Sequence, residues 1–225
     1  MTRRIGIIAA LQGELAPLVK GWARAGDGMW QTHRSQIEVV AAAKGMGAAR
    51  AEQAVLAAEA TGTLTALVSV GWAGASTCGV HPGAAYEVGE VMDALSGERY
   101  ATAAVANPVL LVTADHVAGR EEKHSFAVNQ GASLVDMEAA TVARMARERQ
   151  IPFRCWKAIT DIATENLPDF APFLDAEQQL RTGRLAAYAV THPWVLPALL
   201  RMGRNSKSGA VALRDTLNQW IAEGQ

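Results

Sequence analysis

The sequence predicts an α/β protein with a mixed, largely parallel central β-sheet. Apolar runs with the composition of strands recur along the chain and alternate with helical patterns, as parallel strands joined by helices do. Some runs, such as ALVSV at residues 66–70, are continuously apolar, which is typical of central strands buried on both faces. With 225 residues, half of them hydrophobic, the chain can bury a large core.

Each element is predicted from its local pattern. The first strand is the short apolar run after two arginines, and the later strands are similar runs. The predicted strands are residues 5–10, 37–42, 66–70, 84–91, 109–112, 133–135 and 153–159. Helical patterns lie between several of them, at residues 14–25, 48–60 and 139–149. Residues 79–112 carry few helix signals, so an antiparallel portion of the sheet is expected there.

One domain over residues 1–225 is expected, because no repeat, low-complexity run or linker appears before about Pro168. The segment at about 181–225 differs, with six Lys or Arg against two Asp or Glu. It is interpreted as a pair of closing helices packed on the core, with basic faces in solvent. The alternative is an amphipathic element on a membrane surface or a partner, which the prolines in its apolar run disfavour.

The composition argues against several classes of protein. A formal net charge of −1 gives no indication of nucleic-acid binding. Cys78 and Cys155 lie in apolar surroundings and in no metal-like spacing, so buried free thiols in a reducing cytoplasm are expected. No apolar stretch is long enough to span a membrane, and the N-terminal run is too short for a signal peptide.

Glycines and acids follow several predicted strands, at the sheet edge where open α/β folds bind ligands. The acids are Glu14, Glu138 and Asp161. The glycine loops are residues 44–50 (KGMGAAR) and 70–75 (VGWAGA). Together these features predict a pocket with three carboxylates and the backbone amides of two glycine loops.

Each feature also has an ordinary structural interpretation. Glu14 and Glu138 could be acids favoured by a helix dipole or by capping, and Asp161 could be a turn residue. The glycines could serve tight turns or close packing. The run GMG at residues 45–47 lacks the third glycine of a dinucleotide fingerprint, so no cofactor of that type is expected. The five histidines form no triad or metal-ligand spacing, and a loop or surface position is expected for His116.

Three carboxylates without a His or Cys cluster argue against a zinc-type site and suit a cationic transition state. Cleavage of an N-glycosidic bond has such a transition state. One carboxylate activates water, another protonates or hydrogen-bonds the leaving base, and negative charge stabilises the oxocarbenium-like sugar. A carboxylic acid that donates a proton near neutral pH needs apolar surroundings, which residues such as Ile159 and Ile162 would provide.

Five motifs stand in order along the chain: IGIIAALQGEL at 5–15, GMG at 45–47, VGWAG at 70–74, VDMEAA at 135–140 and AITD at 158–161. They resemble the motifs of the purine nucleoside phosphorylase and nucleosidase superfamily, and most closely those of its methylthioadenosine/S-adenosylhomocysteine nucleosidase branch. The Met-Glu and Thr-Asp motifs in this order are the more specific ones. The resemblance implies a three-layer α/β/α sandwich, usually a dimer or larger, that acts on a purine nucleoside without a metal or cofactor.

The resemblance also implies roles for individual residues. Glu14 would be the general base for the attacking water, and Asp161 would protonate or hydrogen-bond N7 of the leaving purine. Glu138 would hold the ribose hydroxyls, with Met137 packed on the sugar. The other substrate-binding residues would be Val117 and Ala118 at the base edge, together with Gly47, Trp72, Gly74 and Lys157.

The chain departs from the superfamily pattern at positions that bear on the reaction. Trp72 stands where a serine is usual, Lys157 where an arginine is usual, and Val117 where an aromatic residue stacks on the base. Lysine cannot replace the bidentate hydrogen bonding of arginine, so phosphorolysis is disfavoured. The prediction is hydrolysis of an adenosine-type nucleoside; a phosphorylase and a catalytically impaired nucleoside-binding homologue stay open as alternatives.

The C-terminal part carries four further motifs: LPDF at 167–170, LDAE at 174–177, HPWVLPALL at 192–200 and SKS at 206–208. They resemble a narrower group, the hopanoid-associated nucleosidases, which remove adenine from an adenosyl-hopanoid intermediate. An apolar and basic C-terminal segment suits a lipid substrate beside an anionic membrane. The expected location is the cytoplasm, at the membrane surface if this segment contacts lipid.

Overall fold

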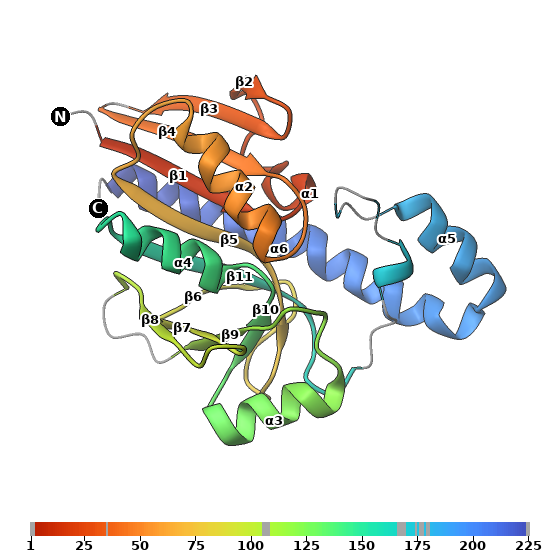
Figure 1. Cartoon of the computed structure of the whole chain (residues 1–225). Helices are drawn as coiled ribbons and strands as arrows, with labels where there is room; N and C mark the ends of the chain where they lie inside the picture. Colours follow the sequence, from red (N-terminus) through yellow and green to blue (C-terminus); the bar gives the residue numbers. More distant parts are fainter. Residues whose placement is uncertain are drawn as a thin grey trace.

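The fold is described from a computed structural model, for residues 3–34, 36–104, 109–165, 170–173, 175, 178 and 181–223. Among these residues, eleven strands form one sheet (Figure 1). The strands are β1 Arg3–Ala9, β2 Ala23–Gly26, β3 Met29–Arg34, β4 Ile37–Ala43, β5 Ala66–Ala75, β6 Ala85–Glu87, β7 Glu90–Asp93, β8 Arg99–Ala101, β9 Leu110–Thr113, β10 Leu134–Asp136 and β11 Phe153–Asp161. The helices are α1 Gln12–Leu15, α2 Ala48–Glu59, α3 Arg120–Gln130, α4 Ala139–Glu148, α5 Thr182–Thr191 and α6 Leu196–Glu223, with 3-10 turns at Ala171–Phe173 and Pro193–Val195.

The sheet is mixed, and its centre is parallel. β5 runs parallel to β1 and β11, and β1 runs parallel to β4. At Gly74 and Ala75, the end of β5 pairs antiparallel with β10, and the sheet continues through β9, β7 and β8. The antiparallel portion expected within residues 79–112 is present, since β6 pairs antiparallel with β11 and β7 with β8. The predicted α/β class with a mixed sheet is therefore confirmed.

Helices cover both faces of the sheet (Figure 1). α2 and α4 pack side by side against β1, β4 and β5, whereas α6 runs along the other face against β11, β5 and β6. The core has a corresponding cluster on each face. On the α2 side it includes small residues such as Ala54 and Ala58. On the α6 side it includes Trp156 and Trp220, whose ring centroids are 5.1 Å apart. This is the three-layer α/β/α sandwich that the resemblance implied.

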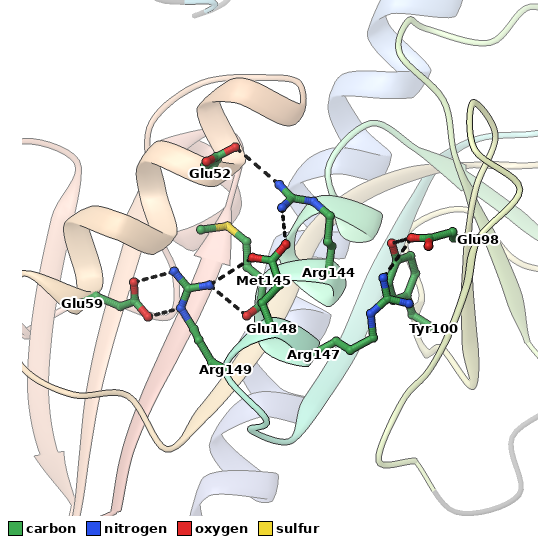
Figure 2. A network of polar contacts seen from close by, with 9 residues as sticks. All are labelled: Glu52, Glu59, Glu98, Tyr100, Arg144, Met145, Arg147, Glu148 and Arg149. Atoms are coloured by element: carbon green, nitrogen blue, oxygen red, sulfur yellow. Dashed lines mark hydrogen bonds and ion pairs between the residues drawn. The ribbon is translucent and has the colours of Figure 1, made fainter.

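Arginines at the C-terminal end of α4 connect this helix to its neighbours (Figure 2). Nη2 of Arg149 donates to Oε2 of Glu59 in α2 (2.9 Å), and Nη2 of Arg147 donates to Oε2 of Glu98, next to β8 (3.0 Å). These pairs lie at or near the surface, so each contributes little stability. Their consequence is positional, because they help to fix the direction of a helix whose N-cap residue is Glu138.

The predicted helix over residues 14–25 is wrong. α1 ends at Leu15, and the chain returns to the sheet as β2 and β3, an edge hairpin that the sequence analysis missed. Pro17 lacks the N–H that a continuing helix needs, and Gly21 adopts a φ of +85°, outside the helical region. The dipeptide Asp27-Gly28 is a hairpin signal that could have identified the turn.

The other differences concern the middle of the chain. The predicted strand over residues 84–91 is two strands, β6 and β7, because the chain changes partner there: the N–H of Val88 bonds to β11, and that of Gly89 to the residue before β9. Helix α3 was not predicted, because its sequence is polar and lacks an apolar stripe; it ends at Gly131 in the left-handed conformation. The remaining predicted strands and helices are present with shifted ends.

The C-terminal segment is helical, as predicted, and α6 packs on the sheet, whereas α5 contacts mainly the two 3-10 turns and buries Ala189 alone among its residues. Pro197 lies in the first turn of α6, where its missing N–H is harmless, so it begins the helix rather than interrupting it. The second half of α6 lies close to the sheet, since a Cβ at Gly209 would be 2.7 Å from the Cβ of Ala158. No helix among the described residues is long and apolar enough to cross a membrane. The single-domain organisation stays a prediction. Of the two cysteines predicted to be buried, Cys155 is buried, whereas Cys78 is exposed, so the prediction is wrong at Cys78.

Candidate active site

A cavity opens at the carboxyl ends of β1, β5, β10 and β11, where the sequence predicts a pocket. Eight of the ten predicted site residues line it: Glu14, Trp72, Gly74, Val117, Ala118, Met137, Glu138 and Asp161. The wall also includes residues that the sequence analysis did not assign to the site, among them Met46, Lys123, Phe170, Met202 and Ser206. Segments from both ends of the chain therefore meet around one cavity.

Glu14 lies in α1, directly after β1, and its buried carboxylate accepts three backbone hydrogen bonds. The N–H groups of Ala10 and Leu11 donate to Oε2 (2.9 and 2.7 Å), and that of Trp72 donates to Oε1 (2.8 Å). Burial raises the pKa of Glu14 above its ordinary value, although these hydrogen bonds and the charge of Lys157 oppose the rise. A fixed carboxylate with a raised pKa has the properties of a general base that works near neutral pH.

Two glycines of β5 make room for the acids. Gly71 adopts a φ of +146°, and a Cβ there would lie 2.7 Å from Oε1 of Glu14. At Gly74, a Cβ would lie 3.1 Å from Oδ2 of Asp161. A side chain at either position would press on a carboxylate of the cavity. Both glycines are therefore required by the neighbouring acids, and Gly71 is required by its backbone conformation as well.

Glu138 is the N-cap residue of α4, but its side chain does not cap the helix. Its carboxylate lines the cavity instead and accepts a hydrogen bond at Oε1 from the N–H of Gly47 (2.7 Å). Burial and the nearby charge of Asp136 raise the pKa of Glu138 to about 8, against the opposing charge of Lys157. Gly47 itself is not part of the cavity wall, so the structure places it behind Glu138.

Lys157 and Asp136 form an ion pair beside the cavity. The Nζ–Oδ2 distance is 2.8 Å, and both side chains are buried. Asp136 also accepts hydrogen bonds from Oγ1 of Thr113 (2.7 Å) and from the N–H of Ala139 (3.0 Å). Burial disfavours the ammonium, but the charge of Asp136 raises the pKa of Lys157 above its ordinary value. Lys157 does not line the cavity, so it is not on the substrate-facing wall where it was predicted.

Asp161 ends β11 and is held from two sides. Oγ1 of Thr160 donates to Oδ1 (2.7 Å), and Nζ of Lys123 forms an ion pair with Oδ2. The expectation of apolar surroundings is wrong, because an ammonium contacts the carboxylate and Ile162 is 40% exposed, while Ile159 packs into the core. Lys123 comes from α3, and no pattern in the sequence of that helix marks it.

Trp72 and His116 form part of the cavity wall. The indole Nε1–H of Trp72 donates to the backbone oxygen of Ser206 (3.2 Å), which links β5 to α6. His116 lines the cavity with a largely exposed ring, whose nitrogens lie 2.6 Å from Asp115 and 2.8 Å from Glu122; these contacts raise the pKa of His116. Within the part of the chain that the structure describes, no group of three or more His, Cys, Asp or Glu side chains could hold a metal ion.

The segment that contributes α3, β10 and β11 to the cavity wall matches a known family. Residues 94–192 match the phosphorylase superfamily. The predicted resemblance to the purine nucleoside phosphorylase and nucleosidase superfamily is thereby confirmed. No match is found among curated proteins.

Solved structures share the nucleoside phosphorylase-like fold over nearly the whole chain. The 5′-methylthioadenosine/S-adenosylhomocysteine nucleosidase of Helicobacter pylori has a TM-score of 0.75 at 14% identity, with 99% of each chain covered. The futalosine hydrolase of the same organism has a TM-score of 0.75 at 14% identity, again with 99% of each covered. The 5′-methylthioadenosine nucleosidase of Arabidopsis thaliana has a TM-score of 0.74 at 17% identity, with 98% of this chain and 95% of that one covered.

In this nucleoside phosphorylase-like fold, three acids surround the cavity from separate elements. Glu14 is held by backbone amides, Glu138 by the Gly47 loop, and Asp161 by Thr160 and Lys123. Carboxylates in these settings can accept a proton from water, accept hydrogen bonds from hydroxyls and contact the polar edge of a heterocycle. The role of each residue stays a prediction.

Proposed function

We propose that this protein hydrolyses the N-glycosidic bond of a purine nucleoside of the adenosine type. The observation that carries the proposal is the meeting of Glu14, Glu138 and Asp161 around one cavity. Three acids at separate points suit a reaction in which positive charge develops on the sugar while water attacks and a base departs. The match to the phosphorylase superfamily and the shared fold with proteins named as nucleosidases support it.

In the proposed reaction, Glu14 accepts a proton from the attacking water. Glu138 accepts hydrogen bonds from the ribose hydroxyls, and Met137 packs on the sugar. Val117 and Ala118 lie along the base, and Asp161 contacts its polar edge. The carboxylates also stabilise the oxocarbenium-like transition state through their charge.

Water is the proposed nucleophile because the cavity offers little to hold a phosphate dianion. Among the described residues, the cations on its wall are Lys123 and, when protonated, His116. Lys123 is paired with Asp161, and His116 contacts two carboxylates. Lys157 is buried behind the wall, and Trp72 stands where the superfamily usually has a serine. Phosphate binding normally draws on hydroxyls and unpaired cations.

The 5′ substituent is proposed to be apolar. Met46, Phe170 and Met202 line the same cavity as the acids, and such side chains favour an alkyl group over a phosphate or a free hydroxyl. A methylthio group or a hopanoid chain has this chemistry. Of the hopanoid-associated motifs, residues 167–169, 174 and 176–177 lie outside the described residues, so the structure does not bear on that part of the resemblance.

Contact with a membrane surface is proposed for the exposed apolar residues near the start of α6. Trp194, Leu196 and Leu200 are 71%, 43% and 52% exposed, and Arg201 and Arg204 lie beside them. Apolar side chains with basic neighbours suit an anionic lipid surface. Sedimentation with anionic vesicles tests this, with Trp194→Ser expected to weaken binding. The chain is further proposed to act in the cytoplasm as a homodimer, which sedimentation equilibrium of the purified protein tests.

Purine release with and without phosphate tests the proposed reaction. The substrates are adenosine, 5′-methylthioadenosine, S-adenosylhomocysteine and an adenosyl-hopanoid, a panel that varies the 5′ group. Release without phosphate is the expected result. Release that requires phosphate would make the protein a phosphorylase, and measurable binding without release would make it a nucleoside-binding homologue.

The variant Asp161→Asn tests the base-side acid. It should abolish release while nucleoside binding persists, because the amide keeps the shape of the carboxylate but not its charge. Binding is measured by calorimetry and release by absorbance. Turnover at the wild-type rate in this variant would contradict the role proposed for Asp161.

A further inference from the structure

We propose that Lys123, held by Asp161, is the proton donor to the leaving base. This inference rests on the proposed hydrolysis and assigns a residue that neither the motifs nor the superfamily resemblance indicated. Lys123 is 2% exposed, yet it forms part of the cavity wall. Burying a lysine ammonium costs free energy unless it is paired with an acid. Here its partner is Asp161, the acid predicted at the base edge.

The surroundings of the ammonium leave it able to donate into the cavity. A lysine ammonium has three N–H donors. Within the part of the chain that is described, its hydrogen-bond partner is Oδ2 of Asp161. Gly74 of β5 lies beside the pair, since a Cβ there would be 3.3 Å from Nζ and 3.1 Å from Oδ2 of Asp161. The ammonium is therefore held by a carboxylate next to a glycine backbone, in the wall of the cavity.

The Lys123–Asp161 pair is complementary to one edge of adenine. That edge presents N7 as an acceptor and the N6 amino group as a donor, whereas a 6-oxopurine presents two acceptors. An ammonium and a carboxylate side by side offer one donor and one acceptor. Lys123 would donate to N7 while Asp161 accepts from the amino group. A 6-oxopurine would instead place its O6 against the carboxylate, so the pair should select 6-aminopurines.

The proton balance of the step is complete without a co-reactant. As the bond between C1′ and N9 breaks, its electron pair passes to the base and N7 takes a proton from Lys123. The base departs neutral, and Lys123 is left as a neutral amine. Water bonds to C1′ and gives a proton to Glu14. Transfer of that proton to Lys123 through solvent restores both groups, so nucleoside and water yield base and sugar.

Two substrates with different leaving groups test the assignment. One is the adenine nucleoside that the wild type cleaves best, and the other is 4-nitrophenyl β-D-riboside, whose leaving group departs without a proton. The variants are Lys123→Gln, which keeps an N–H for Asp161 but cannot release a proton, and Lys123→Met. Both should lower kcat for the adenine nucleoside by about 10²- to 10⁴-fold, the usual contribution of general acid catalysis. Their kcat for the nitrophenyl riboside should change by less than about tenfold, because that reaction needs no acid.

The control is Lys20→Gln, the same change at an exposed position away from the cavity, which should leave both rates unchanged. If kcat of the Lys123 variants falls equally on both substrates, the role of Lys123 is structural and the proposal is overturned. Wild-type activity of these variants on the adenine nucleoside would also overturn it. A wild type that cleaves neither substrate would instead refute the proposed hydrolysis.

A measurement on the wild type covers the case in which the Lys123 variants do not fold. Adenosine and inosine differ at position 6, where the pair is expected to discriminate. The wild type should prefer adenosine by at least about tenfold in kcat/KM, within the range that such paired contacts give. An equal rate or a preference for inosine would overturn the proposed pairing.

Discussion

Replacing Glu138 by Gln should stabilise the free protein, and the gain should grow as the pH rises. Glu138 is buried, and Gly47 supplies the one hydrogen bond found to its carboxylate among the described residues. A Gln at this position keeps the oxygen that accepts this bond. The variant therefore removes a buried charge, and its repulsion with Asp136, without removing a described contact.

The sign and size of this change in stability follow from the pKa of Glu138 in the folded protein. Burial and Asp136 raise it to about 8 from 4.5. Because the folded pKa lies above the unfolded one, the contribution of Glu138 to stability is fully present below pH 4.5 and is lost as the pH rises through 8. The slope is about 1.4 kcal/mol for each pH unit, so the total loss is on the order of 3 to 5 kcal/mol. The Gln side chain does not titrate, so the variant does not lose this stability as the pH rises.

Urea unfolding at pH 5, 6.5 and 8.5 measures this difference. The free energy of unfolding of Glu138→Gln minus that of the wild type should be small at pH 5 and should reach several kcal/mol at pH 8.5. The control is Glu121→Gln, the same change on the exposed face of α3, for which the difference should stay near zero. A flat difference curve for Glu138→Gln, or a variant less stable than the wild type at pH 8.5, would refute the reasoning.

Two further substitutions test the residues that hold the acids in place. Lys157→Met leaves Asp136 buried without its cation, so the free energy of unfolding should fall by about 3–5 kcal/mol, and the double variant with Asp136→Leu should recover much of the loss. Urea unfolding that shows a loss below about 1 kcal/mol would contradict this estimate. Gly71→Ala places a Cβ 2.7 Å from Oε1 of Glu14, so kcat for base release should fall at least about tenfold. An unchanged kcat would show that Glu14 tolerates displacement.

Local sequence patterns are sufficient to predict the central strands of the sheet. β1, β4, β5 and β11 were predicted because continuously apolar runs have few alternatives to a buried strand. The helix expected over residues 14–25 does not form. Pro17 and Gly21 interrupt its helical pattern, and the residues that follow pair as β2 and β3 at the sheet edge. Helix α3 was missed because its sequence lacks an apolar stripe: its one buried side chain is that of Lys123, and Gly131 caps its C-terminal end.

The sequence by itself determined which residue types stand at the strand ends: Glu14, Glu138 and Asp161 follow apolar runs, and the carboxyl ends of such strands meet at one edge of a sheet. Only the tertiary structure decided what surrounds each acid. Lys157 pairs with Asp136 behind the wall, and Lys123 reaches Asp161 from a helix 38 residues earlier in the chain. The physical reason is that a carboxylate's protonation and contacts depend on charges brought near it through space, and chain spacing does not encode such distances.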